Sequence, residues 1–305
     1  MHNEDHDDDD ILYHYTSTAG LLGILSPVGQ PSGWDAKITT TAGSFSLWAT
    51  DVVYLNDTKE LQYGRKQLLR ELRAPVAPGS AMDGTVTWLE GVLGGHLEAP
   101  FEVASDIYGP DRLNFYAACF CEDGDLLSQW RGYGSDKGYA IGFRKSALEA
   151  MIRRAGHPLA VMPVDPLSPV TRLHKVEYGD AAHVLRDAAK TVVADEVTDQ
   201  EAMQLCLEAL AQVKSPAFAS EREWRLFDLD RQNYTPCEYR VGPTGITPYV
   251  RLMYFAMPGM PTPIVNVRVG PGADMELRSR AAEQLLRQRG FGNVEVIPSR
   301  ISYRG

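Results

Sequence analysis

Apolar runs of strand length alternate with helical patterns along almost the whole of this 305-residue chain. Strand patterns such as 12–16, 45–50 and 139–143 are separated by stretches whose apolar residues recur at helical spacing. Neither an internal repeat nor a low-complexity linker divides the series. Because nothing marks a boundary, we expect a single domain over 11–305, with helical insertions.

The helix patterns are clearest towards the C-terminus. The segment 274–290 follows a strand pattern and ends on Gly290, a residue type that commonly closes helices. Apolar spacing also predicts a long helical stretch from about 181 to 213, and a strand over 218–229 comes next. These elements belong to a chain that mixes helices and strands throughout.

The charge of the chain is unevenly distributed. Its formal net charge is -10, and a run at the N-terminus supplies six negative charges. They come from Glu4, Asp5, Asp7, Asp8, Asp9 and Asp10. We expect residues 1–10 to form a solvated, disordered acidic tail, with metal binding through His2 and His6 as the alternative. Binding to a nucleic-acid backbone needs a basic stripe that this sequence does not show.

Patterns for membrane insertion and for disulfide frameworks are both missing from the sequence. No apolar run reaches the ~20 residues that a membrane-spanning helix needs, and an acidic N-terminus has the wrong charge for a signal peptide. Four cysteines are too few for a disulfide framework in a chain of this length. Cys119 and Cys121 lack a second pair or a nearby histidine to complete a zinc site. We therefore expect a cytoplasmic protein with no membrane contact and no metal.

Polar residues occupy the first strand and the start of the helix after it. His14, Tyr15, Thr16 and Ser17 stand where strands usually bury apolar side chains. Ser17 or Thr18 is suited to cap the helix, because a hydroxyl at this position accepts a hydrogen bond from a free backbone amide. A histidine here can bind a ligand or be a satisfied core residue. The local sequence leaves both interpretations open.

Glycines and aromatic residues crowd together in the segment LLSQWRGYGSDKGYAIGF. Gly132 and Gly134 lie beside Trp130 and Tyr133. A backbone without side chains next to flat rings is what a pocket for a flat ligand needs. A connector with aromatic residues packed beneath it is the alternative. The third glycine and the helix of a dinucleotide-binding fingerprint do not follow, which excludes a Rossmann fold.

Two glutamates stand two residues apart in the segment SEREWR. If 221–225 is a strand, Glu221 and Glu223 point to one face, while Arg222 and Trp224 point to the other. Carboxylates side by side on one strand repel each other, so the pair requires either solvent or a function. A glycosidase pair is disfavoured, since that chemistry needs acids on both sides of the scissile bond.

Six segments in order resemble one bacterial family. They are LYHYTS, LWATDVVYLND, LSQWRGYG with GYAIGF, KVEY, F-x-x-E-x-E-W-R, and VGP with NVEVIPSRISYR. Over nearly the whole chain the series resembles the family known as domain of unknown function 2971. More distantly, it resembles the ADP-ribosyltransferase superfamily of the His-Tyr-Glu type. The resemblance implies an α+β fold, with a split, mostly antiparallel sheet, surrounding helices and a nucleotide cleft between the two halves.

The resemblance also implies a role in NAD binding for the first strand. The superfamily carries a histidine in a Tyr-His-x-Thr setting, and YHYT places His14 there. His14 would contact a ribose hydroxyl of the adenosine half. The backbone at Tyr15 and Thr16 would hold the amide of nicotinamide.

The middle and late segments supply the remaining residues that the resemblance implies. Ser128 and Tyr133 are the nearest matches to a serine and an aromatic residue that hold nicotinamide, and Trp130 competes for the stacking role. Arg131 is the candidate for the pyrophosphate. The late strand carries the catalytic glutamate, for which Glu223 is the choice. Glu221 is its rival, or the base that activates the acceptor.

We therefore expect an NAD-dependent mono-ADP-ribosyltransferase that uses NAD as substrate and needs no metal. Its acceptor would be a protein or a nucleic acid, and its setting bacterial conflict or stress. Two alternatives remain open: an NAD glycohydrolase that uses water at the same site, and a non-catalytic module that senses nucleotides or binds proteins. In the expected architecture, His14, the loop 128–133 and Glu223 should converge on one cleft.

Overall fold

The computed structural model describes these stretches of the chain: 11–26, 29–32, 37–40, 42–55, 63–95, 114–134, 137–153, 172–179, 182–194, 197–230, 237–242, 245–254, 256, 259 and 262–302. The acidic run 1–10 and the alternative metal ligands His2 and His6 lie outside the described residues.

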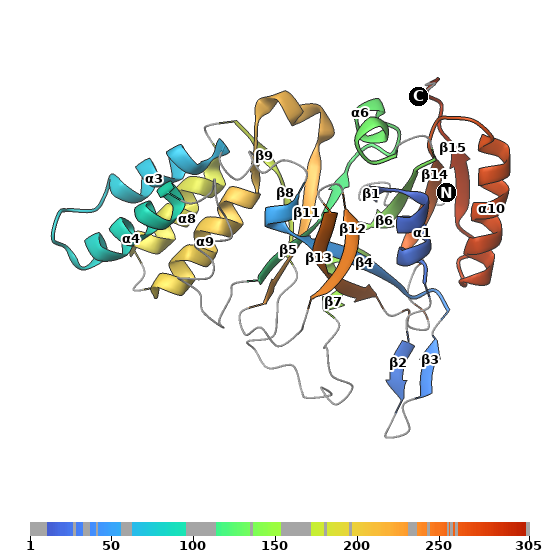
Figure 1. Ribbon diagram of the computed structural model, residues 1–305, viewed down its shortest axis with the longest axis horizontal. Coiled ribbons are helices and arrows are strands. Elements are labelled where there is room, and N and C mark those ends of the chain that lie inside the picture. The colour runs from blue at the N-terminus through green and yellow to red at the C-terminus, as the bar shows by residue number, and fades with distance from the viewer. Residues whose placement is uncertain are drawn as a thin grey trace, which may run out of the picture.

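A large sheet of eleven strands occupies the centre of the molecule (Figure 1). Its main path runs through β12 (Glu238–Gly242), β13 (Gly245–Tyr254), β4 (Phe45–Asp51), β5 (Asn114–Cys121), β1 (Ile11–Thr16), β6 (Tyr139–Arg144), β14 (Ile264–Val269) and β15 (Glu295–Pro298). Three further strands pair beside this path: β11 (Glu223–Asp230) on β5, β8 (Arg172–Lys175) on β11, and β7 (Ile152–Arg153) on β13. Within this sheet only the pair β14 and β15 is parallel among the described strands.

Two small sheets accompany the large one. β2 (Gly29–Ser32) and β3 (Lys37–Thr40) form an antiparallel hairpin. β9 (Glu177–Tyr178) and β10 (Val213–Lys214) form a short parallel pair. Together with separate helices, this mostly antiparallel arrangement confirms the predicted α+β class.

The helices cover the two ends of the sheet (Figure 1). A helical cluster at one end consists of α3 (Arg65–Arg73), α4 (Ala81–Gly95), α8 (His183–Ala194) and α9 (Asp199–Ala211). α10 (Met275–Gln288) covers β14 and β15 at the other end. Shorter pieces are α1 (Thr18–Ile24), η1 (Val52–Tyr54), α6 (Leu127–Gln129), η2 (Trp130–Gly134), α7 (Lys145–Glu149) and η3 (Pro216–Glu221). These short pieces lie next to the strands in the chain or connect them.

Local sequence explains why these helices form where they do. α8 buries Leu185, Ala189 and Val192, whose spacing of four and three residues makes one apolar stripe. α9 begins with a capping box, in which Thr198 and Glu201 each satisfy a backbone amide of the other. The apolar stripes pack together and against β5 and β11, so the helical cluster and the sheet share buried contacts.

Strand β5 changes its neighbour part-way along, which splits the sheet. On one side β5 pairs with β11 along its whole length. On the other side it pairs with β4 at Ala117, opposite Thr50, but with β1 at Cys121, opposite Tyr13. β1 and β4 therefore diverge from each other between these two points. The helix α1 follows β1 directly and contacts β4 in the wedge between them.

Two predicted elements differ from the structure. The stretch 181–213 is two helices followed by β10, because Thr198 begins a second helix with its own capping box. The strand expected over 218–229 begins only at Glu223. Glu221 ends the 3-10 helix η3, and Arg222 has a φ of 44°, in the left-handed region that breaks a strand.

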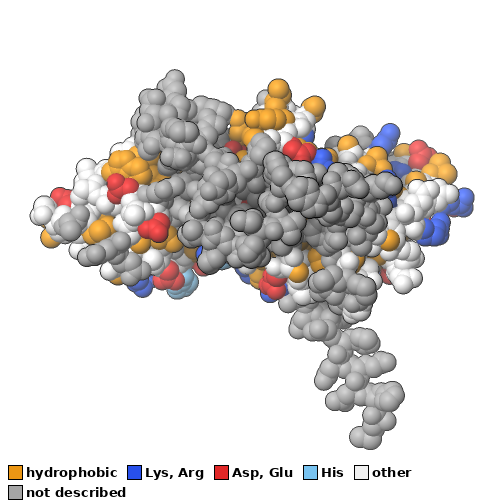
Figure 2. Space-filling view, turned by 90° about the horizontal axis from the view of Figure 1, so that it is seen from below, with side chains coloured by type: hydrophobic (Ala, Val, Ile, Leu, Met, Phe, Trp, Pro, Cys, Tyr) orange, Lys and Arg blue, Asp and Glu red, His pale blue; other side chains and the backbone are white. Residues whose placement is uncertain are grey.

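Charges of both signs are interspersed at the two ends of the face shown in Figure 2, over the helical cluster and over α10. Within the described part of the chain, every helix is too short or too polar to cross a membrane.

Candidate functional site

A cavity of about 350 Å³ lies where the sheet splits. Residues from β1, α1, β4, β5, η2, η3, β11 and the hairpin of β12 and β13 line it. The segment of β5 from Ala117 to Phe120 forms part of its wall, and this segment lies between the two pairing points of that strand. The split therefore opens the sheet at this position and creates the space.

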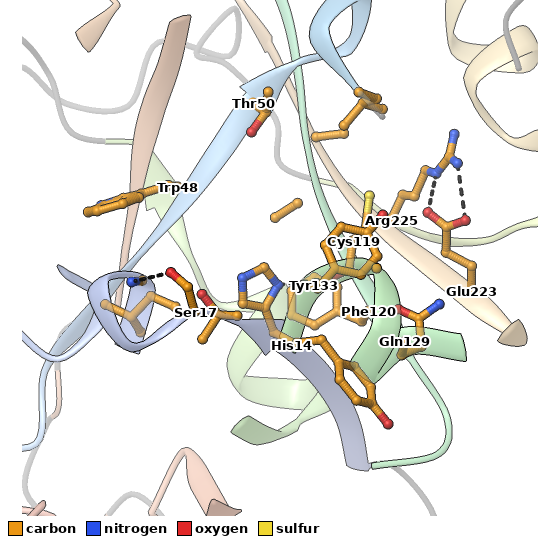
Figure 3. Close-up of a pocket in the computed structure, with 18 of the residues that line it drawn as sticks. His14, Ser17, Trp48, Thr50, Cys119, Phe120, Gln129, Tyr133, Glu223 and Arg225 are labelled. Carbon is orange, nitrogen blue, oxygen red and sulfur yellow. Dashed lines mark hydrogen bonds and ion pairs between the residues drawn. The ribbon is translucent and has the colours of Figure 1, made fainter. Parts of the chain in front are cut away.

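His14 occupies the middle of this cavity, with Trp48 and Ser17 on one side and Glu223 and Arg225 on the other (Figure 3). Its Nδ1 lies 2.9 Å from the carbonyl oxygen of Cys119. A carbonyl can only accept, so Nδ1 carries the proton. Burial lowers the pKa of His14, which favours the neutral ring near neutral pH. The other nitrogen, Nε2, is then an acceptor for a ligand hydroxyl.

Glu223 begins β11 and is held by two cations. Arg225 donates through Nε to Oε1 at 2.7 Å and through Nη2 to Oε2 at 3.1 Å. Lys214 Nζ donates to Oε2 at 3.0 Å. Burial alone raises the pKa of Glu223, but the positive charges and hydrogen bonds of Arg225 and Lys214 outweigh it and bring the pKa to about 2. Glu223 is therefore ionised at neutral pH although it is buried.

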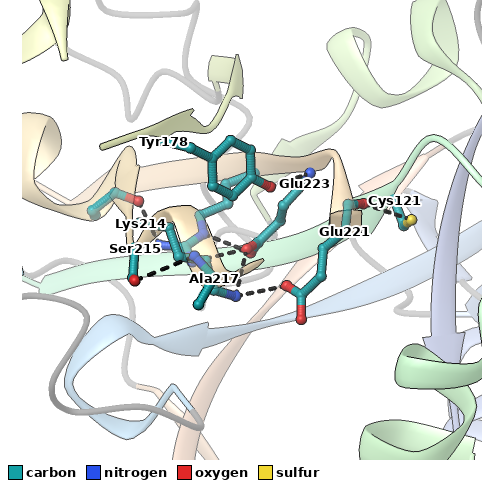
Figure 4. Close-up of polar contacts among 9 residues, drawn as sticks. Cys121, Tyr178, Lys214, Ser215, Ala217, Glu221 and Glu223 are labelled. Atoms are coloured by element: carbon teal, nitrogen blue, oxygen red, sulfur yellow. Dashed lines mark hydrogen bonds and ion pairs between the residues drawn. The ribbon is translucent and has the colours of Figure 1, made fainter. Parts of the chain in front are cut away.

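Glu221 shares the same lysine (Figure 4). Lys214 Nζ lies 2.7 Å from Oε2 of Glu221, so one ammonium group bridges the two carboxylates. The expected repulsion between two acids on one strand face is thus relieved by a cation rather than by solvent. The two side chains meet although Glu221 lies before the strand, because the left-handed residue Arg222 turns the backbone between them.

Backbone contacts fix this cluster in place. The amide of Glu223 donates to the hydroxyl of Tyr178 at 2.8 Å. Arg225 donates through Nη1 to the carbonyl oxygen of Ala211, the last residue of α9, at 2.5 Å. Lys214 follows α9 by three residues, so the helical cluster delivers one cation and anchors the other.

The segment 128–133 is only partly at the cavity. Gln129 and Tyr133 line it, and Tyr133 is 39% exposed at its edge. Ser128 and Arg131 are exposed and do not line it. Trp130 is also outside the lining: its ring is 2% exposed and packs edge-on against Tyr15.

Asp125 explains where Trp130 points, because it accepts a hydrogen bond from the indole Nε1 at 2.8 Å. Tyr15 holds the same loop through its hydroxyl, which donates to the carbonyl oxygen of Asp123 and accepts from the amide of Leu126, both at 2.8 Å. Tyr15 and Thr16 both line the cavity. The first strand thus positions the loop that carries Tyr133.

The structure therefore brings six of the nine residues singled out in the sequence to one cavity. They are His14, Tyr15, Thr16, Tyr133, Glu221 and Glu223. It also adds Lys214, Arg225, Arg240 and Trp48, which the sequence did not point to. Arg225 stands in the EWR segment and could have been found as a partner of Glu223, two residues away on a strand. Lys214 and Arg240 reach the cavity through long-range pairing that no local pattern shows.

Residues 129–226 match the model of a family described as protein of unknown function, DUF2971. The match supports the expected resemblance to this family over about a third of the chain. It contains Tyr133, Lys214, Glu221, Glu223 and Arg225, and stops short of the nearly whole-chain resemblance expected from the sequence. No curated protein and no solved structure matches the chain.

Proposed function

We propose that this protein is an NAD-dependent mono-ADP-ribosyltransferase with an ADP-ribosyltransferase-like fold. It would break the bond between nicotinamide and ribose in NAD and transfer ADP-ribose to a protein or nucleic-acid acceptor. The observation that supports this best is that His14, Tyr133 and Glu223, widely separated in the sequence, line one cavity. A histidine, an aromatic residue and an ionised glutamate are the three groups that the chemistry needs.

Glu223 is suited to the chemical step. When the glycosidic bond breaks, its electron pair leaves with nicotinamide, and the anomeric carbon gains oxocarbenium-like positive charge. A carboxylate near this carbon stabilises the transition state more than bound NAD, where the carbon carries less charge. Nicotinamide leaves as a neutral base, so no acid has to protonate it. Because the pKa of Glu223 is about 2, the carboxylate carries its charge throughout the neutral range.

The other residues have complementary roles. Nε2 of His14 accepts a hydrogen bond from a ribose hydroxyl, and Tyr133 stacks on the nicotinamide ring at the edge of the cavity. The acceptor's nucleophile then bonds to the anomeric carbon, and its proton passes to Glu221. The bridge that Lys214 forms between the carboxylates of Glu221 and Glu223 supports this role, because it holds the two acids close together.

The test is nicotinamide release from NAD by the purified chain, alone and with bacterial extract. We expect Glu223→Gln to lower the rate by ~100-fold or more, as removal of a group that stabilises transition-state charge usually does. Glu295→Gln is the matched control, since Glu295 also begins a strand but is exposed and does not line the cavity. Circular dichroism of each variant checks that it is folded.

Labelled NAD separates the possible outcomes. Label on a macromolecule in the extract indicates transfer, whereas free ADP-ribose alone indicates an NAD glycohydrolase at the same site. NAD binding without nicotinamide release, in the chain and in Glu223→Gln alike, would contradict the catalytic proposal and favour a nucleotide-sensing module.

A further inference from the structure

Arg240 of β12 is a cavity-lining cation whose hydrogen-bonding capacity is largely unused. Its Nη2 donates to the hydroxyl of Thr50 at 2.7 Å, and its guanidinium carbon lies 5.7 Å from the centre of the Trp48 ring. Its Nε is buried and has no hydrogen-bond partner. Among the described residues no carboxylate pairs with it, whereas Glu223 pairs with Arg225 and Glu238 with Arg251.

A partly buried guanidinium without a counter-ion, such as that of Arg240, is costly. Partial burial lowers the pKa of Arg240, because removal from water disfavours the charged form. Such a group is stabilised when an anion enters and accepts from the donors that remain free. The planar fork of a guanidinium matches a phosphate group, which can accept two hydrogen bonds at once. Arg240 therefore favours a phosphate-bearing ligand in the cavity.

The surroundings of Arg240 fit such a ligand. Two hydroxyl-bearing residues, Thr50 and Thr247, also line the cavity, and Thr247 stands opposite Arg240 on the paired strand. Trp48 supplies a flat apolar surface beside the charge. Figure 3 shows Trp48 and Glu223 on opposite sides of the cavity, with His14 between them. A ligand that extends from Glu223 past His14 would therefore contact the residues around Arg240 with the end that lies farthest from Glu223.

We infer that Arg240, with Thr50 and Trp48, forms a subsite that binds the diphosphate of the dinucleotide substrate. This inference rests on the proposed function, because it assumes that the reacting ribose lies at Glu223. It replaces Arg131 in the role expected from the sequence, since Arg131 is exposed and does not line the cavity.

The test is calorimetric titration with ADP-ribose, and with inorganic pyrophosphate as the smallest probe of the subsite. Arg240→Gln is expected to weaken ADP-ribose binding by ~10-fold or more, the size typical of a lost charge-assisted hydrogen bond. Arg240→Lys keeps the charge but loses the fork, so it should recover only part of the affinity. Thr50→Val removes the hydroxyl that orients the guanidinium and should weaken binding by a smaller factor.

Two further arginines serve as comparisons. Arg131→Gln tests the rival residue directly. Arg280→Gln is the neutral control, because Arg280 is exposed on α10 and pairs with Glu276 of the same helix. Neither variant is expected to change the affinity for ADP-ribose.

The binding measurements decide the inference without relying on catalysis. Equal affinity in the wild-type chain and Arg240→Gln, or no binding of either probe to the wild-type chain, would overturn it. A loss of affinity in Arg131→Gln alone would return the role to that residue. If ADP-ribose binds through Arg240 but NAD releases no nicotinamide, the subsite stands and the proposed activity fails. If nicotinamide is released equally well by Arg240→Gln at low NAD concentration, the activity stands and the subsite fails.

Discussion

At the scale of single residues, Lys214 joins the two acids of the site, because its ammonium group pairs with both Glu221 and Glu223. The charged and titratable groups that face Glu223 are Lys214, Arg225, Glu221 and the phenol of Tyr178. Two carboxylates and two cations balance each other in this cluster. Removal of Lys214 would leave two nearby carboxylates with one cation, and like charges raise each other's pKa.

We therefore predict that Lys214→Met moves the acid limb of nicotinamide release to higher pH by ~1 unit or more. In the wild-type chain Glu223 has a folded pKa of about 2, below that of an unfolded glutamate, so its stabilising charge is present above about pH 4.3 and is lost as the pH falls towards 2. In the variant this loss begins at higher pH. The measurement is the pH dependence of the release rate, together with the free energy of unfolding.

Lys175→Met provides the control for the loss of a lysine. Lys175 ends β8, the strand that pairs with β11, and it forms an ion pair with Glu122. It is more than half exposed and does not line the cavity. Its variant should follow the wild-type pH profile. Superimposable profiles for Lys214→Met and the wild-type chain would show that Lys214 does not control the ionisation of the acids.

At the scale of elements, α1 and β4 pack closely beside the cavity. A Cβ atom at Gly23 would lie 2.1 Å from Cζ2 of Trp48, so no other residue fits here without moving the indole ring. Trp48 lines the cavity and lies next to Arg240. The packing of one short helix thus sets the position of a ring in the proposed diphosphate subsite.

Gly23→Ala should destabilise the chain by ~1–3 kcal/mol, as overpacking usually does, and should also weaken ADP-ribose binding. Gly84→Ala is the matched helical control, because a Cβ there meets no atom within 4 Å. This control should gain up to ~1 kcal/mol from better helix propensity and keep the wild-type affinity. Chemical denaturation and calorimetric titration measure the two effects. Unchanged affinity for ADP-ribose in Gly23→Ala would show that Trp48 does not contribute to the subsite.

The elements at the two ends of the described chain could be predicted from the sequence. The opening strand and helix were predicted, with Ser17 as one of two possible caps, and Ser17 caps α1 by accepting from the amide of Gly20. The closing strand, helix and strand are β14, α10 and β15. These elements have strong local patterns, which tertiary contacts did not override.

Other features depended on contacts that no local pattern contains. Glu221 and Glu223 were expected to share a strand face, but the left-handed conformation of Arg222 separates η3 from β11, so the strand begins only at Glu223. Trp130 was a candidate for stacking on nicotinamide, yet Asp125 and Tyr15 hold it in the interior. An aromatic residue beside glycines fits a pocket wall and a core equally well. Only its contacts in the folded chain determine which of the two positions it takes.

At the scale of the whole molecule, the helical cluster and the sheet are joined through their buried surfaces. Phe227 of β11 is 1% exposed and belongs to the same apolar cluster as Leu185 of α8 and Leu210 of α9. Ala117 of β5 contributes to it as well. The helices that position Lys214 and Arg225 thus bury their apolar face on the strands that carry the site. Independent unfolding of the helical cluster would expose this shared surface to water.

We predict that the chain unfolds in one transition and that Phe227→Ala lowers its stability by ~3–5 kcal/mol, the usual cost of deleting a buried aromatic side chain. Far-ultraviolet circular dichroism reports on the helices. The chain has five tryptophans, and Trp34 lies outside the described residues. In a Trp34→Phe, Trp88→Phe background, which also removes the tryptophan of α4, fluorescence reports on Trp48, Trp130 and Trp224 in and beside the sheet. Both signals should shift together to lower denaturant concentration, while Leu277→Ala, at an exposed position of α10, should leave them in place. Two separate transitions, with only the helical signal shifted, would mean that the cluster folds as a unit of its own, and that Lys214 and Arg225 are not held by a single cooperative structure.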